Sequence, residues 1–149
     1  MPTSSTLPDA DPPAELDVLL ASVIQLARSL IERFGELLPF AAVLPAVALD
    51  GEEPELISPW DADQVVPTRE AEEFLIADLR ARAAHGAIRA AALVVQTRRP
   101  VSVAVRLEHA RLPTALIVRT PFTRRRVAGG IRHGAPASEV AVPVLFPGV

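Results

Sequence analysis

The chain changes both its hydrophobic period and the sign of its charge at Gly86. The residues before Gly86 include sixteen of the eighteen acidic residues and five of the fifteen arginines, whereas those after it include two acidic residues and ten arginines. The two parts therefore carry formal charges of about −11 and +8. Apolar residues recur at helical spacing in the first part, and residues 101–108 alternate as a half-buried strand does. This change of period predicts an α+β domain.

Composition narrows the class of protein. A chain of 149 residues is expected to form one domain that buries roughly 70% of its unfolded surface. There is no cysteine, which excludes disulfides, thiol nucleophiles and cysteine metal sites. Residues 1–11 lack the features of a secretory signal, and the apolar stretch 37–49 is shorter than a bilayer requires. We therefore expect a cytoplasmic protein with no membrane segment.

The fifteen prolines divide the chain into elements, because proline is excluded from helix interiors and central strands. The first proline-free stretch predicts a helix that begins at Asp11-Pro12 and ends at Gly35. Its apolar seam is wider than a surface helix needs, so we expect it to lie across a sheet and to contact a second copy. The seam residues predicted to mediate self-association are Leu16, Leu20, Val23, Leu30 and Phe34.

Short strands and a second helix are expected in the rest of the acidic part. Residues 40–49 read as a strand, Asp50-Gly51 as a turn, and residues 53–59 as a short acidic edge strand that carries two prolines. A second helix is predicted from Thr68 to His85. Its expected apolar stripe consists of Phe74, Leu75, Leu79 and Ala83.

Three strands with short connections follow Gly86, at residues 87–97, 101–108 and 115–120. In the strand at residues 101–108, the apolar side chains are expected on one face of the sheet and the polar side chains on the opposite face. The predicted order is α-β-β-α-β-β-β, with two helices covering the apolar side of a five-stranded antiparallel sheet. Residues 139–146 are apolar enough for one more edge strand.

These elements suggest domain limits. Residues 1–10 are predicted to be a disordered tail, residues 11–122 a single α+β domain, and residues 123–149 an arginine-rich extension. The extension's edge strand could join this sheet or that of a partner.

Candidate chemistry is sparse. His85, His109 and His133 are not at metal-ligand spacing, and no phosphate-binding motif is present. We predict no catalytic residue, no cofactor and no metal. An enzyme that uses His109 or a pocket near Trp60 is one alternative reading.

An arginine cluster is the strongest remaining signal for binding. It could attract an acidic protein partner or another anionic ligand, although a pI of about 5.6 disfavours nucleic acid. A binder of nucleic acid or an anion is thus the second alternative. The cluster consists of Arg119, Arg124, Arg125, Arg126 and Arg132.

Three stretches resemble a pattern in small bacterial proteins of uncharacterised function with high-GC codon usage: residues 38–44 with the later Asp50-Gly51, residues 86–95, and residues 105–109 followed by Pro121-Phe122. The element order also resembles roadblock and profilin-like modules. That resemblance implies dimerisation or a scaffolding role. The residue patterns together predict a non-enzymatic interaction module that self-associates as a dimer, with the first helix or the exposed sheet edge as the contact.

Overall fold

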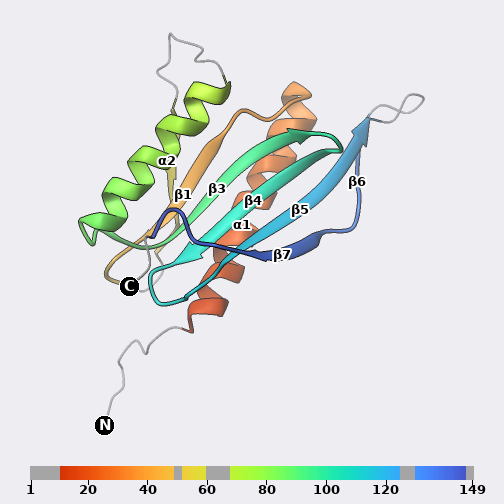
Figure 1. Ribbon diagram of the computed structural model, residues 1–149. Helices are drawn as coiled ribbons and strands as arrows, with labels where there is room; N and C mark the ends of the chain where they lie inside the picture. Colours follow the sequence, from red (N-terminus) through yellow and green to blue (C-terminus); the bar gives the residue numbers. More distant parts are fainter. Residues whose placement is uncertain (1–10, 49–51, 60–67, 125–129, 147–149) are drawn as a thin grey trace.

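The computed structural model describes residues 11–48, 52–59, 68–124 and 130–146. It is an antiparallel sheet with one helix on each face (Figure 1). The elements are α1 (Pro12–Phe34), β1 (Phe40–Pro45), β2 (Glu55–Ile57), α2 (Thr68–Ala84), β3 (Ile88–Arg98), β4 (Val101–His109), β5 (Ala115–Arg124), β6 (Ile131–His133) and β7 (Ala137–Ala141). The predicted α+β class and element order are confirmed. The further edge strand expected within residues 139–146 is found as β7, which begins two residues earlier, and β6 was not predicted.

The strands lie in the order β2-β1-β3-β4-β5-β6, and β7 also pairs with β5. β6 runs beside residues 122–124 of β5, and β7 runs beside residues 115–119 on the same strand. Residues 130–146, which were assigned to the arginine-rich extension, therefore complete the edge of the sheet. No helix in the described residues is long and apolar enough to cross a bilayer.

α1 begins after Asp11 with proline at its first turn and ends at Gly35, which adopts the left-handed conformation with φ 81°. The face that it buries differs from the predicted seam. The apolar stripe centred on Leu19 and Ile31 packs on the sheet. Leu20 and Leu30 therefore lie at the margin of this contact, and Phe34 is 65% exposed. The buried apolar residues of α1 are Leu16, Leu19, Val23, Ala27 and Ile31.

α2 covers the opposite face of the sheet and ends before Gly86, which has φ 68°. The prediction that Phe74 belongs to its buried stripe was wrong, because Phe74 is 55% exposed. The stripe that packs on the sheet is Ala71, Leu75 and Leu79, at spacings of four residues.

The expectation that both helices cover the same side of the sheet was also wrong. α1 covers one side of β4, and residues 144–146 pack at Glu108 on the other side, so β4 buries Ser102, Ala104 and Glu108 along with Val103 and Val105. β1 ends at Pro45, earlier than predicted. The predicted Asp50-Gly51 turn lies outside the described residues.

Candidate interaction groove and buried polar clusters

An apolar groove lies between the C-terminal half of α1 and the edge strand β2. Its volume is about 590 Å³. A smaller hollow of about 330 Å³ continues it along β2 and shares two of its side chains, Leu26 and Leu56. The residues that line the groove are Leu26, Leu30, Phe34, Glu36, Leu38, Phe40, Leu56, Ile57 and Ser58. Phe34, Leu38 and Leu56 are exposed, so an apolar surface of this groove faces solvent.

The local sequence explains why the groove stays open. Pro54 and Pro59 flank β2 and restrict it to three residues. α1 packs mainly on β3 and β4, and within the described ranges no helix or strand covers its β2-facing flank. Leu56 pairs with Ala42 and so points to the α1 face of the sheet, where it faces that flank.

Charges of both signs surround the groove. The Arg33 guanidinium lies over the Phe34 ring, 5.5 Å from its centroid. Glu36 lines the groove and Glu53 lines the adjoining hollow. None of these three charges is in an ion pair within the described part of the chain. The rim therefore has positive and negative groups available for a partner.

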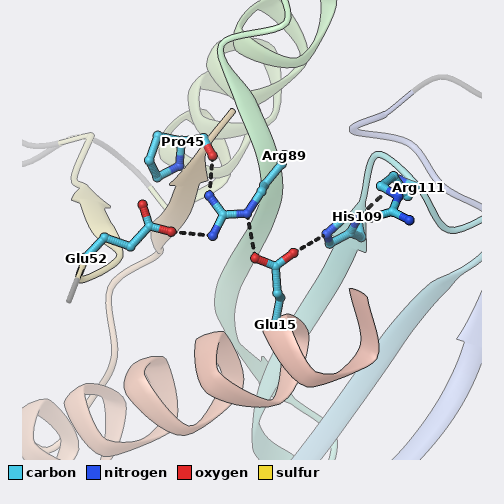
Figure 2. Close-up of polar contacts among 6 residues, drawn as sticks. All are labelled: Glu15, Pro45, Glu52, Arg89, His109 and Arg111. Atoms are coloured by element: carbon cyan, nitrogen blue, oxygen red, sulfur yellow. Dashed lines mark hydrogen bonds and ion pairs between the residues drawn. The ribbon is translucent and has the colours of Figure 1, made fainter. Parts of the chain in front are cut away.

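Arg89 organises a buried polar cluster at the other end of α1 (Figure 2). Its Nε donates to Glu15 Oε2 at 2.6 Å, and its two terminal nitrogens donate to the Pro45 carbonyl and to Glu52 Oε1. These contacts tie the start of α1 to the end of β1 and to the segment before β2. Arg89 lies near the start of β3, directly before the apolar run of residues 90–95, and the two carboxylates neutralise it there.

His109 joins the same cluster from the end of β4 (Figure 2). Its Nδ1 accepts the backbone N–H of Arg111 at 3.0 Å, so Nε2 carries the proton that is donated to Glu15 Oε1 at 2.9 Å. The side chain is 1% exposed and both ring nitrogens are occupied. His109 is therefore a structural link between β4 and α1, out of reach of a substrate.

The cluster shifts the ionisation of its members. Burial alone raises the pKa of Glu15, but hydrogen bonds from His109 and Arg89, together with the Arg89 charge, bring that pKa below its ordinary value. Burial likewise lowers the pKa of Arg89, and the Glu52 and Glu15 carboxylates more than offset it, so its pKa is raised. The geometry keeps Glu15 ionised and Arg89 charged.

A second buried carboxylate, Glu108, lies on the opposite face of the sheet. Its Oε1 accepts the backbone N–H of Leu145 at 2.9 Å and of Phe146 at 3.0 Å, and Oε2 accepts that of Val144 at 3.0 Å. Leu145 is fully buried beside Leu75 and Leu79 of α2. Burial of one such leucine contributes about 1.5–3 kcal/mol. Glu108 thus anchors the C-terminal segment beside α2, and it faces away from His109, because adjacent residues of a strand point to opposite faces.

The three histidines are not brought together. His85 is exposed just after α2, and His109 is in the Arg89 cluster. His133 packs on Phe122, and its Nε2 has no hydrogen-bond partner. Burial and the Arg28 charge lower the pKa of His133. Among the described residues, no group of histidine and acidic side chains could hold a metal ion.

The arginine cluster is described only in part. Arg119 forms an ion pair with Glu139 across β5 and β7, and Arg132 is exposed on β6. Arg124 ends β5, but its side chain is outside the described structure, as are Arg125 and Arg126. The proposed pocket near Trp60 also falls outside the described residues.

The residues predicted for self-association separate into two groups. Leu16 and Val23 are buried in the core and are unavailable to a partner. Leu20 and Leu30 are partly buried at the margin, and Leu30 lines the groove with the exposed Phe34. Sequence reasoning missed Leu38 and Leu56 as parts of this surface. It also missed the Glu15–Arg89 pair, although an arginine that adjoins a long apolar run in a strand signals that a partly buried partner is needed.

A scan against protein-family models and searches of curated proteins and of solved structures gave no match. The geometry and charge of the described surface are therefore the basis for the functional proposal.

Proposed function

We propose that this protein is a non-enzymatic, cytoplasmic interaction module that self-associates through the groove between α1 and β2. The supporting observation is the apolar surface formed by Phe34, Leu38 and Leu56 at the mouth of that groove. Exposed apolar surfaces that adjoin a concave, apolar site are typical of interaction sites. In the proposed dimer, Phe34 of each copy enters the groove of the other.

The charges at the rim favour a second copy as the occupant. A twofold contact uses the same surface on both subunits, so the surface must be complementary to itself. Here Arg33 lies beside Phe34, while Glu36 and Glu53 lie along the groove that receives it. When Phe34 enters the partner groove, Arg33 approaches carboxylates there. A purely acidic or purely basic rim would disfavour this arrangement.

Side chains, rather than sheet extension, make this contact. β2 has three residues and is flanked by prolines, so it offers few backbone groups to another strand. The flank of α1 and Leu38 provide most of the apolar surface. The resemblance of the element order to roadblock and profilin-like modules agrees with a dimeric module, at the level of fold only. The enclosed position of His109 agrees with a non-enzymatic role.

The test is light scattering at micromolar concentration, with Phe34→Asp as the variant. The wild-type chain is expected at twice its monomer mass of 15.9 kDa, and the variant at the monomer mass. Phe74→Asp is the matched control, because Phe74 is exposed to a similar degree but lies on α2 across the sheet. That control should remain dimeric. A monomeric wild-type protein, or an F34D dimer of unchanged stability, rules out this contact.

A further inference from the structure

The C-terminal residues 137–146 are held in the manner of a bound peptide. Their first half, β7, adds to the free edge of β5 through the backbone ladder from Ala137–Arg119 to Ala141–Ala115. Their second half crosses the α2 face, where Leu145 fills an apolar site and the Glu108 carboxylate accepts successive backbone N–H groups. Strand addition with one buried anchor is a recurring mode of peptide recognition.

Most of the hydrogen bonds that hold residues 137–146 are made to the main chain of the segment. Val140 and Val142 are 70% and 78% exposed, so they contribute little burial. Two further contacts also go to backbone carbonyls: Arg106 donates to Val142 at 3.0 Å and Arg80 donates to Val144 at 2.7 Å. Leu145 is the only side chain of the segment that is fully buried. Such a segment can leave with the core under α1 intact, and from the core under α2 it removes only Leu145 and the partly buried Val144 and Phe146.

The surface that the segment covers needs an occupant. Without β7, residues 115–119 of β5 would present an open edge. Without residues 144–146, the Glu108 carboxylate would lose its three backbone donors. The same segment from a second copy would restore every one of these contacts, because all of its partner groups are identical. Exchange of an identical element is a low-cost route to a dimer.

A short connection provides the hinge. β6 and β7 follow the same edge of β5 and are joined by residues 134–136. Gly134 is fixed to β5, because its N–H donates to the Pro121 carbonyl at 2.7 Å and a Cβ would lie 2.8 Å from Pro121 Cγ. In an exchanged dimer, the chain would therefore leave its own β5 at Ala135 and Pro136. We propose that the surface under residues 137–146 is a peptide-binding site that also accepts this segment from a second copy.

This inference is independent of the groove at α1, so it is tested in the Phe34→Asp background. The chain has no cysteine, which allows single cysteines to report one contact. Leu116 and Val140 are direct partners between β5 and β7. An L116C chain and a V140C chain are mixed, warmed to just below the unfolding midpoint, cooled and oxidised. A disulfide-linked L116C–V140C heterodimer is expected.

The matched control replaces L116C with Val18→Cys, an exposed position on α1, and should give only background cross-linking. Equal cross-linking in the two mixtures, or none in either, overturns the proposal.

A second measurement uses a fluorescent peptide of residues 136–146 and the full-length chain. Leu145→Asp weakens the chain's own segment, so the peptide should bind this variant at least about tenfold more tightly than the wild type. Circular dichroism establishes that the variant is folded. Equal affinities for the folded variant and the wild type contradict an exchangeable segment. If L145D does not fold, the cross-linking of L116C to V140C alone tests the proposal.

Discussion

The two faces of the sheet each bury a carboxylate, and they stabilise it in different ways. On the α1 face, Glu15 is held by the side chains of Arg89 and His109. On the α2 face, Glu108 is held mainly by backbone N–H groups of residues 144–146, with Arg106 at 3.2 Å. The first arrangement links three parts of the core through charge, whereas the second fixes the position of one terminal segment. Loss of Glu15 contacts should therefore be global, and loss of Glu108 contacts should be local.

The largest effect is expected from Arg89→Met. It removes the cation that Glu15 and Glu52 share and leaves their carboxylates enclosed without it. Breaking a buried ion pair on one side costs about 3–5 kcal/mol in the free energy of unfolding, which urea denaturation measures. Arg82→Met is the control, because Arg82 pairs with Asp78 and Glu55 near the surface and should contribute less than about 1 kcal/mol. Similar losses for the two variants would contradict the central role of Arg89.

Glu108→Ala is expected to cause the next largest loss in the free energy of unfolding, about 2–3 kcal/mol. Each unsatisfied buried donor costs about 1–3 kcal/mol, but the segment can move so that its N–H groups reach water. The distinguishing measurement is hydrogen exchange. Protection should fall in residues 137–146 while that of α1 stays unchanged. Glu108→Gln retains one acceptor oxygen and should lose less. Uniform deprotection across the chain would show that Glu108 supports the whole fold.

Low pH should remove the stabilisation that ionised Glu15 provides on the α1 face of the sheet. Because the pKa of folded Glu15 lies below its ordinary value of 4.5, the stabilisation is fully present above that value and is lost as pH falls through the lowered pKa. Urea midpoints measured from neutral pH downward should therefore decrease below about pH 4.5. Glu15→Gln should show a smaller decrease over that range. An identical acid profile for the two proteins would assign the decrease to other carboxylates.

The smallest effect is expected from Arg119→Ala. Its ion pair with Glu139 joins β5 to β7, but both side chains are about half exposed and screened by water. A loss of less than about 1 kcal/mol is expected, and it should diminish further in high salt. Thermal unfolding at two salt concentrations measures it. A loss as large as that of Glu108→Ala would mean that the pair, rather than the carboxylate, anchors the segment.

Sequence reasoning succeeded where local chemistry limits the backbone. Asp11-Pro12 and Gly35 mark the ends of α1, and Gly86 marks the end of α2, because proline and glycine restrict or permit particular backbone angles. It was less successful with side-chain direction. α1 has two adjacent apolar stripes, one through Leu20 and Leu30 and one through Leu19 and Ile31. Their hydrophobicity is alike, so only the shape of the sheet selects between them.

The candidate groove was predictable only in part. Phe34 was identified from the helix pattern, but Leu38 and Leu56 come from a connection and an edge strand whose distance from α1 is set by packing. Glu15 lies in the first turn of α1, where the helix dipole alone favours an anion, while its contact with His109 spans 94 positions in the chain. No local pattern reports a contact of that separation.

The amino-acid sequence by itself determined the order of the elements as far as β5, the ends of both helices and the division of charge at Gly86, because these depend on the residues nearby. Only the tertiary structure decided which face of α1 is buried, that the helices lie on opposite sides, and which buried charges meet. Those outcomes depend on packing two helices against one twisted sheet, where the burial of each side chain is set by elements far away in the chain.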